Sequence, residues 1–392
     1  MMRTLDDPVL KGGLALARDR TPQAGQDARL PMDLRLVSAD THWELSQDIF
    51  IERFPAHLKD RAPRVTFDGI WRVGYPGQTP ADPLAQEMAE RMRKVLSLVI
   101  APGMSDMALR ATHLAEEGVE KEIAYPQGVN GFFRHPDLEL REWVYRVYNE
   151  HLAEVQQQSG GRFYGVGVCS NWWDPAKAEA AIGQIADLGL KTFMIPTMSP
   201  GNMADGRPIF YGGEEMAPFW SAAAEAGLPV AFHVGENFAL NAPDSFATSV
   251  IVNMGCFRKP FCELVFSGVF DRHPDLRVVF AEGGIGWVPA ALQDAEATVD
   301  SHLGALPYIP KHRPSDYWFN NCYATFQNDV LGLRLIDYIG AERIMWANDY
   351  PHNEGAFGYG RRSAQTVLNL LPGDQARLAL GETAASLYRL DS

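Results

Sequence analysis

A carboxylate, an imidazole and a second carboxylate follow the first apolar run of the chain. The run LRLVSA at residues 34–39 leads directly into Asp40, His42 and Glu44. In an extended chain, residues two positions apart point to the same side, so these three side chains can converge. Nitrogen and oxygen donors at that spacing suit a divalent metal. The alternative is an ordinary loop, in which the aspartate caps a helix and the glutamate lies on the surface.

Three more polar residues lie at the ends of later apolar runs. His233 lies in PVAFHV, Glu282 ends RVVFAE and Asp349 ends RIMWAND. Each has an ordinary explanation when taken alone: a hydrogen-bonded core histidine, a buried salt bridge and a turn-forming aspartate. A carboxylate that ends an apolar strand is nevertheless costly to bury without a partner. Because one metal needs about four ligands, such residues at the ends of four runs favour a shared metal site.

Eight β-type apolar runs alternate with helical stretches along the chain. They lie at 34–39, 122–126, 162–169, 191–196, 229–234, 277–282, 320–326 and 343–349. This alternation indicates βα units around a parallel sheet. Eight units fit a (β/α)8 barrel of the α/β class better than an open sheet. In such barrels the active site lies at the C-terminal ends of the strands, where these polar residues occur.

Three segments do not fit the alternation. Residues 1–33 are polar and rich in Arg, Asp and Gly, which predicts a mobile or surface-wrapping extension. Residues 50–105 contain several prolines and aromatic residues and are expected to be an insertion over the barrel mouth. Residues 236–272 are expected to be a second one. The sequence therefore predicts one barrel domain over residues 34–392 with two lid insertions.

Composition excludes several classes of partner. The net charge of -14 argues against nucleic acid and anionic lipid, both of which need a basic surface. No apolar run approaches the length of a membrane span, and no secretory signal is visible, so we expect a cytoplasmic protein. None of the four cysteines forms a CxxC pair, and we expect buried thiols in a reducing compartment. These are Cys169, Cys256, Cys262 and Cys322.

These motifs, in this order, resemble the amidohydrolase superfamily, in particular the amidohydrolase-2 branch of aminocarboxymuconate-semialdehyde and resorcylate-type decarboxylases. The resemblance runs from about Leu34 to the C-terminus and implies a distorted (β/α)8 barrel with a metal. It rests on DxH at Asp40 and His42, HxG at His233 and Gly235, HPDLRVVFAEGG at 273–284 and ANDYPH at 347–352. The family's four ligand positions then fall on Asp40, His42, His233 and Asp349.

Two departures from that family affect the expected chemistry. Its decarboxylases usually carry a histidine as acid and base where this chain has Glu282. Glu44 is an additional carboxylate, and Glu236 could reach the same place or cap a helix. So many carboxylates would repel one another around a single ion, which favours a second cation. Lys191 begins its strand, so it lies at the wrong end to bridge two metals as a carboxylated lysine, whereas His352 is available as a further ligand.

The surplus of carboxylates is similar to that of the TIM-barrel non-haem dinuclear monooxygenases of this superfamily. This second resemblance implies two Fe ions, or Fe with Mn, that activate O2 and hydroxylate a small or terpenoid carboxylic acid. The expected ligands are Asp40, His42, Glu44, His233, Glu282, Asp349 and His352. Trp43, Trp287 and Phe232 are expected to form a dry wall.

Two other activities use the same residues and remain open. In a hydrolase, with Zn as the alternative metal, Asp349 would deprotonate a metal-bound water that attacks an amide, ester or lactone. In a non-oxidative decarboxylase of an aromatic or unsaturated acid, Glu282 would replace the histidine. The sequence favours oxygen activation, with Asp349, Glu282 and His352 as catalytic residues. An inactive barrel that supports an active sister subunit is a fourth interpretation.

The expected partner is a small-molecule carboxylic acid. Three cations in the predicted insertions could hold its carboxylate, although surface charge is an alternative role for each: Arg72, Arg258 and Lys259. Aromatic-rich insertions also favour a homo-oligomer or pairing with a related subunit.

Overall fold

The computed structural model describes residues 28–45, 48–67, 71–76, 83, 86–87, 90–91, 102–236, 242, 244–352 and 354–391. Most of the predicted extension, residues 1–33, and parts of both predicted insertions therefore lie outside the described residues.

Eight parallel strand positions form the centre of the molecule. The strands are β1 (Val37–Trp43), β4 (Lys121–Pro126), β5 (Phe163–Gly165) with β6 (Gly167–Val168), β7 (Phe193–Met194), β8 (Val230–His233), β9 (Val278–Ala281), β10 (Cys322–Phe326) and β11 (Ile344–Trp346). Only Val166 separates β5 from β6, so these two occupy one position. Each of the eight apolar runs identified in the sequence overlaps one of these strand positions.

The strands pair in the orders β1-β4-β5 and β6-β7-β8-β9-β10-β11, with parallel neighbours throughout. The ring closes between β1 and the end of β11 through a parallel bridge that joins Thr41 to Tyr350. The His42 amide donates to the Tyr350 carbonyl at 2.7 Å, and the Asp349 amide donates to the Asp40 carbonyl at 3.0 Å. The prediction of a (β/α)8 barrel is confirmed.

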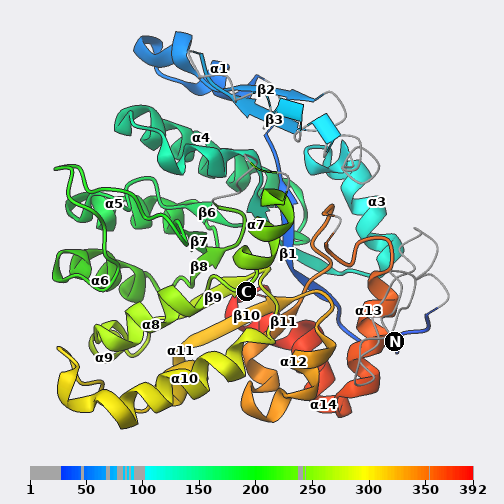
Figure 1. Ribbon diagram of the computed structural model, residues 1–392. Helices are drawn as coiled ribbons and strands as arrows, with labels where there is room; N and C mark the ends of the chain where they lie inside the picture. The colour runs from blue at the N-terminus through cyan, green and yellow to red at the C-terminus, as the bar shows by residue number, and fades with distance from the viewer. Residues whose placement is uncertain are drawn as a thin grey trace.

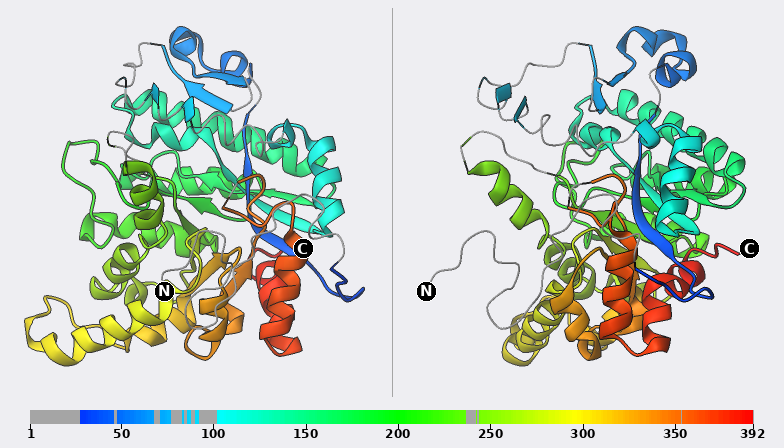
Figure 2. Two further views of the ribbon diagram at one scale, coloured as in Figure 1. Left: turned by 45° about the vertical axis from the view of Figure 1, so that its right-hand side comes forward. Right: turned by 90° about the vertical axis from the view of Figure 1, so that its right-hand side faces the viewer.

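Helices surround these strands (Figures 1 and 2). They include α3 (Met107–Glu117), α4 (Leu138–Gln158), α5 (Pro175–Asp187), α6 (Ala217–Ala226), α8 (Arg258–Phe266), α10 (Trp287–His302), α11 (Pro314–Asn321) and α13 (Gly360–Leu370). Several begin at an aspartate whose carboxylate accepts from free amides of the first turn. Asp106 does so for α3, Asp137 for α4 and Asp174 for α5.

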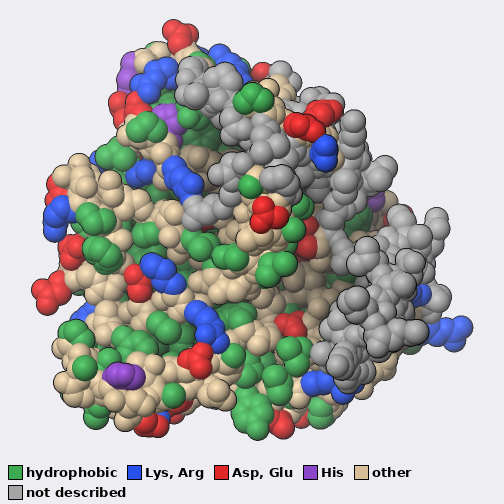
Figure 3. Space-filling model, viewed as in Figure 1, with side chains coloured by type: hydrophobic (Ala, Val, Ile, Leu, Met, Phe, Trp, Pro, Cys, Tyr) green, Lys and Arg blue, Asp and Glu red, His purple; other side chains and the backbone are tan. Residues whose placement is uncertain are grey.

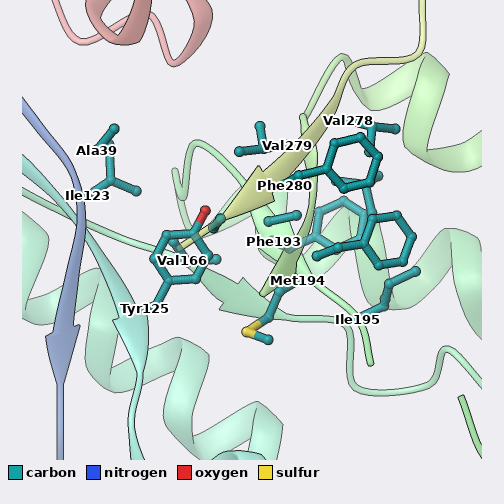
Figure 4. Packing of buried hydrophobic residues seen from close by; sticks show 14 of the residues in the cluster. Ala39, Ile123, Tyr125, Val166, Phe193, Met194, Ile195, Val278, Val279 and Phe280 are labelled. Carbon is teal, nitrogen blue, oxygen red and sulfur yellow. The ribbon is translucent and has the colours of Figure 1, made fainter. Parts of the chain in front are cut away.

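The core lies between the strands and the helices. β9 is buried along its whole length, and Figure 4 shows Val278 and Phe280 on the same side of β9 as Phe193 and Ile195, with Val279 on the other side. A parallel strand covered on both faces needs apolar residues at successive positions rather than at alternate ones. This requirement explains why the strands were recognisable as continuous apolar runs.

The first predicted insertion contains α1 (Ile49–Arg53), the 3-10 helices η1 (Ala56–Arg61) and η2 (Pro102–Met104), and a hairpin of β2 (Arg64–Phe67) and β3 (Trp71–Gly74). The hairpin and α1 lie at one end of the molecule beyond α4 (Figures 1 and 2). The hairpin contacts η3 (Gly128–Arg134), which follows β4 at the C-terminal ends of the strands.

The segment predicted as the second insertion contains three described helices, α7 (Ser245–Asn253), α8 and α9 (Val269–Arg272). Phe261 and Leu264 of α8 are fully buried, and the Phe261 ring lies 6.3 Å from that of Trp318. Helix α8 therefore packs on the barrel as the helix between β8 and β9. The described part that stands apart from the βα alternation is α7.

Among the described residues, no helix has the length and apolar character needed to cross a membrane. On the face shown in Figure 3, Lys and Arg side chains are interspersed with acidic ones. All four cysteines are free; Cys169, Cys256 and Cys322 are buried and Cys262 is half-buried.

Candidate metal centre

The C-terminal ends of four strands bring six polar side chains together. Asp40 and His42 come from β1, His233 ends β8, Glu282 follows β9, and the segment after β11 carries Asp349 and His352. The two aspartates are fully buried, and His42, His233 and Glu282 are between 2% and 4% exposed. Side chains of this kind enter a protein interior only when they are paired or bind a metal.

One group consists of Asp40, His42 and His233, whose ligand atoms all lie within 4.8 Å of one another. His233 Nε2 is 3.4 Å from Asp40 Oδ1, and His42 Nε2 is 3.9 Å from the same oxygen. His233 Nδ1 lies 2.7 Å from the Val234 carbonyl, which can only accept a hydrogen bond. The proton of a neutral His233 is therefore on Nδ1, which leaves Nε2 free to bind a metal.

A second group consists of His42, Glu282, Asp349 and His352, again within 4.8 Å. Asp349 Oδ1 is 3.1 Å from His42 Nε2 and 3.3 Å from His352 Nδ1. His352 Nε2 lies 2.8 Å from Gln127 Oε1, an acceptor that places the ring proton on Nε2 and leaves Nδ1 for a metal. The two groups share His42, and Glu282 Oε2 is 3.2 Å from His233 Nε2.

Two buried ligand atoms of these residues have no hydrogen-bond partner, Asp349 Oδ2 and His352 Nδ1. Unsatisfied buried atoms also occur elsewhere in the described residues, but buried polar atoms usually have a partner, so these two require an explanation. A bound cation provides one, and the mixed nitrogen and oxygen donors fit a divalent metal.

Two residues of the second group have a strained backbone. Glu282 has φ of 72° and Asp349 has φ of 54°, in the left-handed region that favours glycine. For non-glycine residues such conformations cost about 1–3 kcal/mol and concentrate at functional sites. Glu282 is held there by its amide, which donates to Thr325 Oγ1 at 2.7 Å.

The buried carboxylates of the site shift the pKa values of the groups around them. Burial and the neighbouring Asp349 raise the pKa of Glu282 to about 7. Burial opposes charging of His233, but Asp40 and Glu282 outweigh it and raise the pKa of His233 to about 9. Burial and the neighbouring His352 hold the pKa of His42 well below its usual value. The carboxylates thus favour positive charge beside them, which a bound divalent cation would also supply.

Glu44, predicted as a ligand, is not brought into either group. Its Oε1 accepts from the Leu45 amide at 3.0 Å and its Oε2 from the Gly128 amide at 2.7 Å. The strand β1 ends at Trp43, so the alternation that orients Asp40 and His42 does not extend to Glu44. The geometry gives no support to Glu44 as a bridge between two metals.

Glu236 is also separate from the two groups. The amides of Thr197, Met198 and Ser199 donate to its carboxylate, the last two at 3.1 and 3.0 Å. Glu236 therefore holds the loop after β7. It is not one of the carboxylates that surround the candidate metal site.

The aromatic residues predicted as a dry wall pack elsewhere. Phe232 precedes His233 in β8 and so points to the opposite face, toward Tyr211 and Phe280. Trp287 packs against Phe257, Phe280 and Trp318. Trp43 donates from Nε1 to His151 Nε2 at 3.1 Å. All three rings lie in the layer between strands and helices. Each residue occupies the side of its strand or helix that faces this layer.

The cations predicted to hold a substrate carboxylate also lie away from the buried site. Arg258 pairs with Asp294 at 2.7 Å and Lys259 with Glu263 at 2.9 Å, and both cations are about half exposed. The side chain of Arg72 lies outside the described part of the structure. Neither described cation points to the buried site.

Three residues near the site were not predicted. The Tyr125 ring at the end of β4 lies 4.6 Å from that of His233, and Thr325 Oγ1 is 3.3 Å from Asp40 Oδ2. Gln127 contacts His352. Tyr125 and Thr325 lie at the ends of their strands, so the rule that identified the acids and histidines could have identified them too.

Comparison with known proteins identifies the family. Residues 101–390 match the family described as amidohydrolase, of the amidohydrolase-2 type. The chain belongs to this family. The matched residues begin after β1, so Asp40 and His42 enter the site on geometry rather than on the family match.

Among curated proteins, the chain is 27% identical over 278 residues to a gamma-resorcylate decarboxylase of Rhodococcus jostii (strain RHA1), covering 65% of this chain and 79% of that protein. It is 24% identical over 257 residues to the 2-amino-3-carboxymuconate-6-semialdehyde decarboxylase of Dictyostelium discoideum, covering 62% and 68%. These relatives confirm the predicted branch of the superfamily.

Solved structures confirm the fold. An amidohydrolase from Mycobacterium avium subsp. paratuberculosis K-10 superposes with a TM-score of 0.68 at 19% identity, covering 91% of this chain and 98% of that one. A dihydroxybenzoic acid decarboxylase from Polaromonas sp. JS666 with bound manganese gives 0.62 at 17% identity, covering 92% and 98%. The chain is thus an amidohydrolase-fold enzyme whose buried histidines and carboxylates could hold a divalent metal. The comparisons favour the decarboxylase alternative and give no support to iron or oxygen activation.

Proposed function

We propose that this chain is a metal-dependent decarboxylase that releases CO2, without an oxidant, from a small aromatic or unsaturated carboxylic acid. The observation that carries the proposal is the buried set of Asp40, His42, His233 and Asp349 at the C-terminal ends of three barrel strands. This set lies in a chain whose curated relatives are decarboxylases.

These four residues would hold one divalent metal. Two imidazoles and two carboxylates suit Mn or Zn, and a relative of the same fold binds manganese. When bound, the metal would act as a Lewis acid that binds and polarises oxygen atoms of the substrate. His233 Nδ1 and the Val234 carbonyl orient the ring for this role.

Decarboxylation also needs a proton for the carbon that loses its carboxylate. Glu282 takes the position where the family's decarboxylases usually carry a histidine. Its Oε1 is 3.6 Å from His352 Nδ1, and its Oε2 is 3.2 Å from His233 Nε2. We assign Glu282, with His352 beside it, to deliver this proton to the carbon as the bond to CO2 breaks; Glu282 then regains a proton from solvent.

The test is CO2 release under argon by the Mn-loaded protein, with 2,6-dihydroxybenzoate and 5-carboxyvanillate as probes. Chelated protein is the control. Release that requires metal but not O2 supports the proposal. Metal-dependent O2 consumption with a hydroxylated product, or release of an alcohol or amine from an ester or amide, would replace it with the corresponding oxygenase or hydrolase.

A dinuclear oxygenase is the second candidate because the two ligand groups share His42 and together contain three carboxylates. Glu282, Asp349 and His352 would hold the second ion, with Asp349 shared between the two, and Fe or Mn suits such donors. Two metal equivalents per chain, with O2 consumption, would favour this candidate. A cytoplasmic location and pairing with a second copy or a related subunit stay predictions.

A further inference from the structure

Helix α3 directs polar side chains toward the place where the barrel closes, which we call the β1–β11 seam. Arg110, His113 and Glu117 are three and four residues apart, so they lie along one face of α3. Arg110 and Glu117 are 0% and 7% exposed. The face of a helix that packs on a barrel is normally apolar, so charged groups there need a specific reason. Figure 1 shows α3 on the same side of the barrel as α13, next to β1.

Arg110 binds the outer side of β1. Its Nε and Nη2 donate to Glu122 of β4 at 2.7 and 2.6 Å, and Nη2 also donates to Thr41 Oγ1 at 2.8 Å. Its Nη1 donates to the carbonyls of His42 at 2.7 Å and Gly103 at 3.3 Å. These contacts use all five donors of the guanidinium. They fix the backbone of His42 from behind while its imidazole enters the metal site.

Glu117, two turns further along α3, binds the segment that follows β11. Its carboxylate accepts from Asn348 Nδ2 at 2.7 Å, from the Gly358 amide at 2.6 Å and from the Gly360 amide at 3.1 Å. Asn348 Oδ1 in turn accepts from Ser38 Oγ of β1 at 2.9 Å. Asn348 directly precedes the aspartate of the metal site, so Glu117 fixes that ligand on the second strand of the seam.

His113 contacts the seam between these two points. Its Nδ1 lies 2.9 Å from the hydroxyl of Tyr350, the residue after the metal-site aspartate. The Arg110 guanidinium lies 4.8 Å from the centre of the same Tyr350 ring. A Cβ at Gly103 would come within 2.2 Å of the Tyr350 hydroxyl, so a glycine is needed there.

The seam itself has little pairing to fix its geometry. β8 and β9 are joined at four successive positions, whereas β1 and the end of β11 are joined by the single bridge between Thr41 and Tyr350. Both sides of the seam nevertheless supply ligands of one metal site. Some other element must therefore keep those ligands in register, and α3 contacts both sides.

We propose that α3 is a brace for the metal centre and that Arg110 and Glu117 are positioning residues that hold the ligand-bearing ends of β1 and β11 at a fixed separation. The proposal rests on the metal site of the proposed function but not on the reaction. Contacts behind metal ligands typically change metal affinity or activity about 10- to 100-fold.

The experiment measures the Kd for Mn2+ by competition with a chelator, and the Tm of the metal-free protein, for the full chain and Glu117→Gln. The matched control is Asp271→Asn. Asp271 also accepts three hydrogen bonds, from Tyr308, Lys311 and Tyr317, but it lies on α9, before β9 and hence at the opposite end of the barrel. We expect Glu117→Gln to weaken Mn2+ binding about 10- to 100-fold, and Asp271→Asn less than about 2-fold, at comparable losses of Tm.

Arg110→Lys is the second variant, since it keeps the charge but loses the two-pronged contact with Glu122. It should weaken Mn2+ binding by a similar factor and alter the EPR spectrum of the bound ion. If Arg110→Lys fails to fold, the Kd of Glu117→Gln for Mn2+ alone tests the brace. An unchanged Kd in Glu117→Gln, or an equal loss in Asp271→Asn, overturns the brace.

The brace and the proposed reaction fail differently. A wild-type chain that binds Mn2+ but releases no CO2 overturns the decarboxylase and leaves the brace to the Kd comparison. A wild-type chain that binds no Mn2+ overturns the brace together with the metal site.

Discussion

The two ligand groups of the site differ in how the chain supplies them. Asp40, His42 and His233 belong to strands β1 and β8; His42 and His233 pair with neighbouring strands, and Asp40 lies at a register shift of β1 between Ser38 and Thr41. Glu282 and Asp349 follow their strands in left-handed backbone conformations. A regular strand fixes a side chain by its alternation, whereas a strained residue depends on contacts made by other segments. We therefore expect the strand group, together with Asp349, to bind the metal, and Glu282 with His352 to determine the reaction.

Loss of a ligand from the strand group should have the largest effect. His233→Ala removes a buried imidazole whose Nε2 is oriented by the Val234 carbonyl. We expect bound metal to fall to background and activity to disappear, while circular dichroism still shows a folded barrel. Metal analysis of wild type and variant after the same loading provides the measurement. Full metal content in the variant would show that His233 is not a metal ligand. It would also contradict the proposed distinction between the two groups.

A change at Glu282 should affect the reaction more than the metal content. Glu282→Gln keeps the shape of the side chain but cannot carry the proton, so we expect metal content to be retained and kcat to fall about 100- to 10,000-fold. Glu282→His is the matched variant, because it restores the residue usual in the family's decarboxylases. It should recover part of the lost kcat. Loss of metal in Glu282→Gln would instead make Glu282 a ligand and favour the dinuclear candidate.

His352 sharpens the comparison further. In a one-metal site it only adjoins Glu282 and Asp349, so His352→Phe should keep one metal equivalent and lower kcat about 10- to 100-fold. The measurement is the metal-to-protein ratio together with kcat. A fall from two equivalents to one would show that Glu282, Asp349 and His352 hold a second ion.

The smallest effect is expected from a substitution of His151, which contacts Trp43 on the outer face of β1. Burial lowers the pKa of His151 from 6.5 to about 4, and its Nε2 accepts from Trp43. The folded state thus binds this proton less readily than the unfolded state, so stability is lost as the pH falls from about 6.5 toward 4. His151→Phe should lose less stability over that window and keep wild-type metal affinity at pH 7. Urea unfolding at several pH values tests this, and an equally steep loss in the variant would contradict it.

The sequence predicted the strands and the inward ligands because both follow from local patterns. Continuous apolar runs mark parallel strands that are buried on both faces, and Asp40 and His42 alternate within one of them. Glu44 was misplaced because nothing local showed that β1 ends at Trp43. The proposed aromatic wall was misplaced because Phe232 is adjacent to His233, and adjacent residues of a strand face opposite sides.

Other features of the site depend on contacts between distant parts of the chain. Glu117 and Asn348 are 231 positions apart, and the spacing of residues along α3 does not indicate which strand each one contacts. The left-handed conformations of Glu282 and Asp349 similarly carry no local signal, since neither residue type requires them. Only the closed barrel brings these contacts together.

The central claim is that one buried divalent metal lies where β1, β8 and β11 end. The most direct measurement is the metal-to-protein ratio of the Mn-loaded chain after removal of free metal, for the wild type and for His233→Ala. The account predicts one equivalent in the wild type and none in the variant. No metal in the wild type, or the same ratio in both proteins, would contradict it.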